Sequence, residues 1–148
     1  MRSDLTGPFW DGVNGRAPVP AAARTLGLEV IEADPAGAVT LAFAATDAFV
    51  NPAGNVLGAF LAAMLYDTVG PALLATLAPD EFQSMIELHT AFLRPVRPGR
   101  VVGHGRVVDR LGDIAFLTAE LTDARGSIIA RATATARVIP LADAPAAA

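Results

Sequence analysis

Residues 55–77 read NVLGAFLAAMLYDTVGPALLATL, and this stretch decides the fold. It contains a single charged residue, Asp67, and it is long enough for one helix that is apolar on every side. A membrane span is the competing interpretation, but an acid at mid-span and the Gly70-Pro71 step would both be costly in lipid. We therefore expect a long central helix that is buried by the rest of the protein.

The segments on both sides of this helix show the alternation of apolar and polar residues that is typical of β-strands. The strands are expected at residues 28–33, 38–44, 84–93, 101–110, 113–122 and 127–139. Short connections favour antiparallel pairing, with the last three strands as a meander. A helix between the second and third strands can be covered only if the sheet curls around it, so the sequence predicts an α+β fold.

The 148 residues show no break in composition, which predicts a single domain. Its expected extent is residues 1–140, with residues 1–26 as an N-terminal cap. Residues 141–148 are rich in alanine and proline and are expected to form a flexible tail. One edge of the sheet stays free for a partner chain, so a homodimer or a homotetramer is expected.

Composition excludes several kinds of chemistry. The chain has no cysteine and no lysine, which removes thiol nucleophiles, disulfides, thiolate metal sites and Schiff bases. His89 and His104 are too few for an all-histidine zinc site, and a metal is not expected. A net charge of −4 does not favour nucleic acid as a partner. The N-terminus has no secretory pattern, which predicts a cytoplasmic location.

Three short motifs indicate a family. They are residues 51–59 (NPAGNVLGA), 65–68 (LYDT) and 92–95 (FLRP). From about residue 9 to residue 140, the chain resembles the phenylacetate-degradation (PaaI-like) hotdog-fold acyl-CoA thioesterases. This resemblance implies a long helix wrapped by a curved antiparallel sheet. It also implies hydrolysis of an acyl-CoA or aryl-CoA thioester, with coenzyme A as part of the substrate and no separate cofactor.

The resemblance also implies a set of site residues. Asn51 and Gly54 match the family's loop, and Gly58 matches a glycine of the His-Gly-Gly step that opens its helix. Asp67-Thr68 resembles the family's Asp-Thr pair, whose aspartate acts as base or nucleophile, usually from across a dimer interface.

The same residues make physical sense without the family. The N–H of Gly58 at a helix start could bind an oxyanion, and the Asp67 carboxylate could activate water. We expect burial in an apolar segment to raise the pKa of Asp67. The alternative is that Asp67 only forms a hydrogen bond with neighbouring backbone.

Four positions depart from the family pattern. Leu57 stands at the family histidine, Ala59 at the second glycine, and Met85 where threonine or serine is common. Counting from Asn51 without a gap puts Tyr66, not Asp67, at the family aspartate. One residue rotates a helical side chain by about 100°, so on that count Asp67 would be a bystander.

Further binding candidates lie on the strands that follow the helix. Alternation puts Met85, Glu87 and His89 on one face of residues 84–93, where Met85 and His89 could line a pocket. Arg94 and Arg110 could grip the phosphates of coenzyme A, although charges beside turns are often only solvated.

These observations leave three functions open. The first is a thioester hydrolase that uses Gly58 as oxyanion donor, Asp67 as base, and Asn51 and Tyr66 as positioning groups. The second is a disabled site, with Leu57 and Ala59 in an apolar pocket that holds an acyl or other apolar ligand without turnover. The third is a different reaction in the same pocket, carried by Tyr66 and His89.

Overall fold

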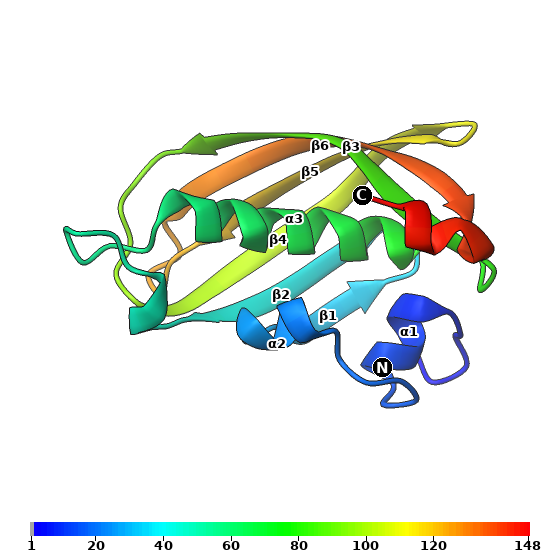
Figure 1. The fold of residues 1–148 in the computed structure, drawn as a ribbon, viewed down its shortest axis with the longest axis horizontal. Helices are drawn as coiled ribbons and strands as arrows, with labels where there is room; N and C mark the ends of the chain where they lie inside the picture. Colours follow the sequence, from blue (N-terminus) through cyan, green and yellow to red (C-terminus); the bar gives the residue numbers. More distant parts are fainter. Residues whose placement is uncertain (1) are drawn as a thin grey trace.

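Across residues 2–148, the part of the chain that the computed structural model describes, one long helix lies lengthwise against a six-stranded antiparallel sheet (Figure 1). The helix is α3 (Gly58–Leu74). The strands are β1 (Glu29–Asp34), β2 (Ala38–Ala45), β3 (Glu81–Phe92), β4 (Gly99–Leu111), β5 (Ile114–Thr122) and β6 (Ile128–Pro140). The short helices are α1 (Pro8–Val13) and α2 (Ala21–Thr25), and the 3-10 helices are Asp47–Phe49 and Leu141–Ala146. The predicted α+β fold around a central helix is confirmed.

The strand order in the sheet is β1-β2-β4-β5-β6-β3. The predicted meander of the last three strands is therefore present as β4, β5 and β6. Strand β3, which follows the helix in the chain, pairs with β6 at the far edge. The chain thus crosses the face of the sheet as α3 and enters the sheet again at the opposite edge (Figure 1).

Helix α3 is shorter at both ends than the predicted range of 55–77. Its start is delayed because Val56 is extended: it forms a β-bridge with Val50, and its N–H donates to the Val96 carbonyl at 2.8 Å. Beyond Leu74 the chain tightens into i→i+3 hydrogen bonds. No helix in residues 2–148 is long and apolar enough to span a membrane.

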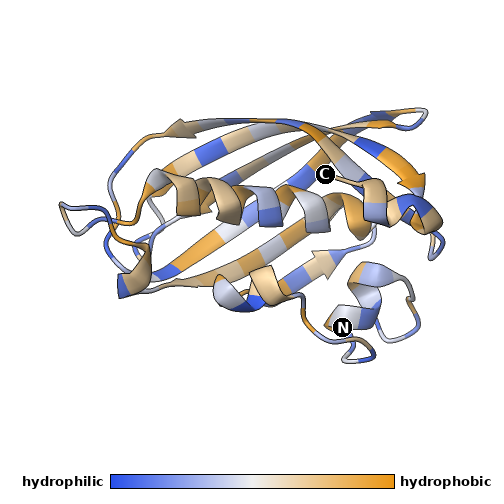
Figure 2. Cartoon of the chain, viewed as in Figure 1, coloured by the Kyte–Doolittle hydropathy of each residue, from blue (hydrophilic) through white to orange (hydrophobic). Residues whose placement is uncertain are grey.

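The core lies between α3 and the inner face of the sheet. Met64, Leu65 and Val69 of the helix are fully buried there with Leu41 and Leu117 of the sheet. Along the strands, hydrophobic and hydrophilic residues alternate (Figure 2), which is the pattern of a sheet with one face on the core and one face in water.

Helix and sheet come close together where Thr68 meets two glycines of β4. A Cβ atom at Gly105 would lie 2.8 Å from the Thr68 carbonyl oxygen, and one at Gly103 would lie 2.5 Å from Thr68 Oγ1. The Thr68 hydroxyl donates to the Met64 carbonyl at 2.7 Å, so this buried hydroxyl has a hydrogen-bond partner. Glycine at these positions therefore sets the distance between the two layers.

Gly105→Ala should lower the free energy of unfolding by about 1–3 kcal/mol, because the added methyl group has to push against helix backbone. Urea unfolding of the purified protein measures this change. Gly12→Ala is the matched control, since a Cβ at that position meets no atom within 4 Å. Equal unfolding midpoints for Gly105→Ala and the parent would show that the layers are not this close.

Strand β3 contains a bulge that changes which side chains share a face. The register shifts between Met85 and Glu87, so Ile86 is an extra residue and is 53% exposed. Met85 is buried in the core, and Leu88 packs against the same core. The prediction that Met85 shares a face with His89 is therefore wrong, because alternation holds only in a strand without a bulge.

The N-terminal cap is fixed to the second half of α3. The indole N–H of Trp10 donates to the Ala75 carbonyl at 3.1 Å, and Trp10 is almost completely buried. The cap ends where the Leu26 carbonyl accepts a hydrogen bond from Ala44 of β2. Residue 1 of the predicted cap lies outside the described residues.

The C-terminal residues pack against α3 and β3. After the 3-10 helix Leu141–Ala146, the Ala148 carbonyl accepts a hydrogen bond from the Tyr66 hydroxyl at 2.8 Å. The Ala148 N–H donates to Ser84 Oγ at 3.0 Å. The composition of residues 141–148 predicted a flexible tail and did not indicate these contacts.

Candidate active site

The start of α3 is held by the loop before it. The Asn51 side-chain oxygen accepts hydrogen bonds from the N–H groups of Ala53 and Asn55, at 2.9 and 3.1 Å. The Leu57 N–H donates to the Phe49 carbonyl at 2.8 Å. Asn51 therefore shapes the loop through its carbonyl oxygen, which fixes where the helix begins.

The first turn of α3 offers free hydrogen-bond donors. Leu57 caps the helix without a side-chain acceptor, and the N–H groups of Gly58 and Ala59 have no acceptor among residues 2–148. They lie at the positive end of the helix dipole. A hollow of about 240 Å³ borders Gly58, Asn51, Phe92 and Arg94. This end of the helix can stabilise negative charge on an oxygen atom.

Glycine at position 58 also has a packing reason. A Cβ atom there would lie 3.3 Å from the ring of Phe92, which is tighter than an ordinary contact. The missing side chain thus leaves room for Phe92 over the helix start. The neighbouring Leu57 and Ala59 are exposed, so both predicted substrate-binding residues are accessible at this end of the helix.

Asp67 lies in a second and larger hollow. This cavity has a volume of about 440 Å³ and is enclosed by the cap, β1, β3 and the second half of α3. Among the described residues that line it, Asp67 is the only charged one. One carboxylate oxygen, Oδ2, is buried and has no hydrogen-bond partner within residues 2–148. Burial raises the pKa of Asp67 from 3.8 to about 6, as expected from the sequence.

The raised pKa of Asp67 should make the protein less stable as pH rises. Between pH 3.8 and about 6 the folded state keeps a proton on Asp67 that the unfolded state releases, so stability falls through this window. The full cost is present above pH 6 and amounts to about 3 kcal/mol. Asp67→Asn should therefore gain stability over the parent at pH 7.5 and gain about a third as much at pH 4.5. Urea unfolding at both pH values measures the difference; an equal difference at both would contradict the raised pKa.

Tyr66 stands beside Asp67 and lines the same cavity. Its side chain is partly buried, and its hydroxyl is engaged by the Ala148 carbonyl. Burial raises the pKa of Tyr66, and the neighbouring Asp67 charge raises it further. Tyr66 is consequently a neutral hydrogen-bond donor at physiological pH.

The two hollows lie at different places along α3. Gly58 and Asp67 are nine residues apart in sequence, which corresponds to about 13 Å along a helix. One thioester carbonyl cannot reach both from within a single protomer. The candidate residues therefore form two half-sites: Asn51, Gly58 and Arg94 at the helix start, and Tyr66 and Asp67 under the cap.

The remaining predicted binding residues lie in other places. Arg94 borders the helix-start hollow, where its guanidinium donates to the Ile128 carbonyl. Arg110 borders a separate hollow and pairs with Glu81 at 3.7 Å. His89 is exposed and lies 3.2 Å from the Glu87 carboxylate, away from both half-sites. Tyr66 and His89 are thus not brought together.

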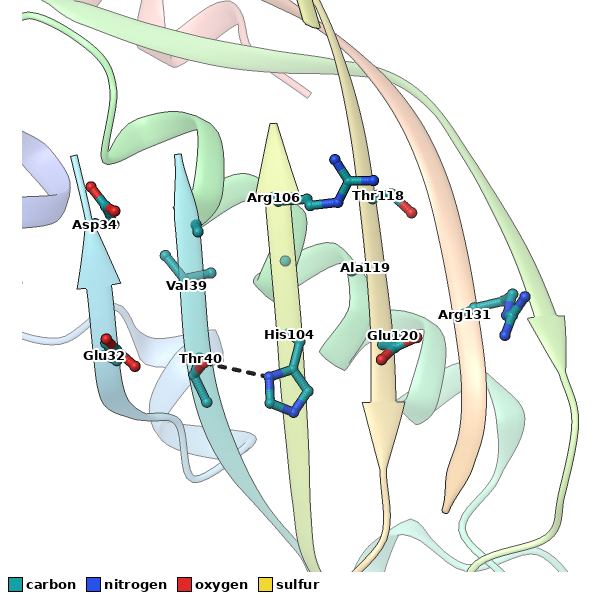
Figure 3. A pocket seen from close by; sticks show the side chains of 12 residues that line it. Glu32, Asp34, Val39, Thr40, His104, Arg106, Thr118, Ala119, Glu120 and Arg131 are labelled. Carbon is teal, nitrogen blue, oxygen red and sulfur yellow. Dashed lines mark hydrogen bonds between the residues drawn. The ribbon is translucent and has the colours of Figure 1, made fainter. Parts of the chain in front are cut away.

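The outer face of the sheet carries a fourth hollow, of about 560 Å³ (Figure 3). Its charged side chains are of both signs and come from four strands: Glu32, Asp34, Arg106, Glu120 and Arg131. His104 also faces it and lies 3.4 Å from the Thr40 hydroxyl. The charges are mixed, and none of the predicted catalytic residues lies here, so this hollow has no evident role in acyl transfer.

Comparison with known proteins decides the family. The sequence model described as Thioesterase superfamily matches residues 53–130, which is more than half of the chain. The chain belongs to this superfamily. The matched segment includes Gly58, Asp67 and Arg94. A search of curated proteins gave no match.

The chain is also similar to several proteins of solved structure. A phenylacetic acid degradation-related protein from Ralstonia eutropha is 38% identical, with a TM-score of 0.84 over 87% of this chain and 98% of that one. A thioesterase family protein from Silicibacter pomeroyi is 20% identical, with a TM-score of 0.80 over 90% and 99% of the two chains. PaaI from the E. coli phenylacetic acid degradation operon is 17% identical, with a TM-score of 0.79 over 88% and 93%. The hotdog fold and the PaaI-like resemblance are confirmed, the last two structures bearing on the fold alone.

The cavity under the cap contains one polar residue that the sequence did not single out, Gln83. Its side chain is 6% exposed, and its Oε1 has no hydrogen-bond partner within residues 2–148. Its amide nitrogen lies 3.1 Å from the position of a Cβ at Gly70. The available signal was its spacing: Gln83 stands two residues before Met85 and so shares the inner face of the strand, where an amide is unusual.

Proposed function

We propose that this protein hydrolyses acyl-CoA thioesters at a site built from two protomers. One observation carries the proposal: a largely buried carboxylate, with an unpartnered oxygen and a pKa near neutrality, lies on the same helix whose first N–H groups are free. A base with a pKa close to the working pH and preorganised donors for an oxyanion are the two groups that ester and thioester hydrolysis needs.

The chemical steps follow from these two groups. Asp67 takes a proton from water as the water oxygen attacks the thioester carbonyl carbon. The carbonyl oxygen then carries negative charge, which the Gly58 and Ala59 N–H groups stabilise. When the tetrahedral intermediate collapses, the carbon–sulfur bond breaks and the free acid is released. Coenzyme A leaves as a thiolate and takes up the proton that Asp67 removed from water, which restores the Asp67 carboxylate.

A second copy of the chain would join the two half-sites. In a two-fold symmetric dimer each residue pair across the interface occurs twice, so Asp67 of each protomer could face the helix start of the other. The exposed first turn at Leu57 and Ala59 leaves this helix end accessible to a partner. Arg94 would then offer a guanidinium to a coenzyme A phosphate beside the thioester.

A second candidate function is binding without turnover. It is favoured by the apolar lining of the Asp67 cavity and by Leu57 and Tyr66, which stand where the family pattern has polar groups. In that case an acyl or aryl ligand would occupy the cavity, and the oxyanion donors would have no base opposite them.

Release of free thiol from a panel of acyl-CoA and aryl-CoA substrates separates the two functions. Steady turnover above the uncatalysed rate supports hydrolysis. The absence of turnover across the panel, combined with saturable binding of an acyl-CoA by calorimetry, supports the binding function and overturns our proposal.

A further inference from the structure

We propose that the cavity between the cap and α3 binds an apolar molecule that carries a primary ammonium group. This goes beyond thioester hydrolysis, because such binding needs only one protomer and no reaction.

Two side-chain oxygens of residues that line this cavity are buried and lack partners. They are Asp67 Oδ2 and Gln83 Oε1, and both are acceptors without a donor among residues 2–148. Buried polar atoms are nearly always hydrogen-bonded. Two buried acceptors without a donor beside one cavity therefore indicate that a bound molecule supplies the donor. The terminal torsions of both side chains are soft, which lets either oxygen turn toward a bound group.

Strand β3 brings the Gln83 amide to the face of α3 that carries Asp67. The Gln83 amide packs against Gly70, which is three residues after Asp67. Residues at i and i+3 lie on the same face of a helix, about 5–6 Å apart at their Cβ atoms. A single small polar group can therefore contact both the carboxylate and the amide. Because Gly70 has no side chain, the Gln83 amide has room to pack against the helix at this position.

The remaining wall fixes the class of ligand. It is mainly apolar, with Phe9, Leu28, Val30, Leu74 and Phe82 among the lining residues. An ammonium group has three N–H donors and a positive charge, so it can serve both acceptors and neutralise Asp67. A hydroxyl has one donor and no charge. A hydrocarbon has no donor and would leave both oxygens unpaired.

Three probes that share a 2-phenylethyl group test this inference. They are 2-phenylethylamine, 2-phenylethanol and the N,N,N-trimethyl derivative of the amine. Their dissociation constants are measured with the full chain by calorimetry at pH 8. We expect the amine to bind at least about tenfold more tightly than the alcohol, since its bonds to the carboxylate are charge-assisted. The trimethyl derivative keeps the charge but has no N–H, and it should also bind more weakly than the amine.

Variants identify the site. Asp67→Asn should weaken amine binding about tenfold, and Gln83→Met should weaken it about threefold. Asp47→Asn changes an exposed acid and is the control; it should leave amine binding unchanged. Amine binding should also weaken below pH 6. Among the described residues that line the cavity, Tyr66 is the only other titratable one, and its pKa is raised, so the pH dependence reports Asp67.

Equal affinities for the amine and the alcohol, or amine binding that Asp67→Asn does not change, would overturn the inference. Either result would mean that the ammonium group does not use these two oxygens as acceptors. Because the readout is binding, it is independent of thioester turnover. Amine binding in a protein that releases no thiol would leave this inference standing while removing the proposed hydrolysis.

Discussion

Asp67→Asn should lower the rate of thioester hydrolysis by about 100-fold or more, which is the usual contribution of a general base. The amide keeps the shape of the side chain but cannot accept a proton from water. The measurement is kcat/KM for thiol release at pH 8 on the best substrate of the panel. Asp47→Asn, an exposed acid outside both half-sites, is the matched control and should keep the parent rate.

The pH profile gives an independent readout of the same group. The rate for the parent should fall as pH drops through about 6, because Asp67 becomes protonated and can no longer act as base. At pH 8 the carboxylate is ionised and the rate should be at its plateau. If the unfolding measurement finds Asp67→Asn at least as stable as the parent at pH 7.5, lost activity does not come from unfolding.

Tyr66→Phe distinguishes the two alignments of the helix with the family, one that puts the family aspartate at Asp67 and one that puts it at Tyr66. If Asp67 is the base, removing the Tyr66 hydroxyl should change the rate only a few-fold. A rate that Asp67→Asn leaves intact and Tyr66→Phe abolishes would refute the assignment of Asp67. It would also support the gapless alignment, in which position 66 carries the function.

Much of the fold follows from periodicity in the sequence. The apolar run after Asn51 predicts the central helix, and alternation predicts all six strands within a few residues of their observed ends. The pairing of β3 with β6 does not follow from periodicity, because it depends on which edge of the sheet the chain joins after the helix. The bulge at Ile86 also left no signal, since one extra residue alters the faces of a strand without altering its composition.

The site is predicted in part. Gly58 and Asp67 are recognisable because a helix start and a lone acid in an apolar segment are local features. Their separation into two hollows follows from the spacing of nine residues and the rise of a helix. The partner of Asp67 in its cavity, Gln83, is not predictable in the same way, since it comes from a strand 16 residues later in sequence and meets the helix only through the tertiary fold.

Gly58→Pro should lower hydrolysis by about 100-fold to 1000-fold, the effect of removing one oxyanion donor. Proline has no N–H, yet it is well tolerated at the first position of a helix. The preceding Leu57 already has φ −59° and ψ 135°, which suits a residue before proline. Gly58→Ala is the matched control: it adds a Cβ against Phe92 but keeps the N–H, and it should retain most of the activity.

Mixing the two inactive variants tests whether the half-sites belong to different protomers. In a heterodimer of Gly58→Pro and Asp67→Asn, one of the two composite sites has both an intact helix start and an intact carboxylate. Random exchange of subunits makes half of the dimers mixed, so activity should recover to about a quarter of the parent value. If both groups acted within one protomer, every site would keep one defect and mixing would restore nothing. Recovery after unfolding and refolding the variants together, but not separately, would therefore establish that α3 of each copy contributes one half of the other copy's site.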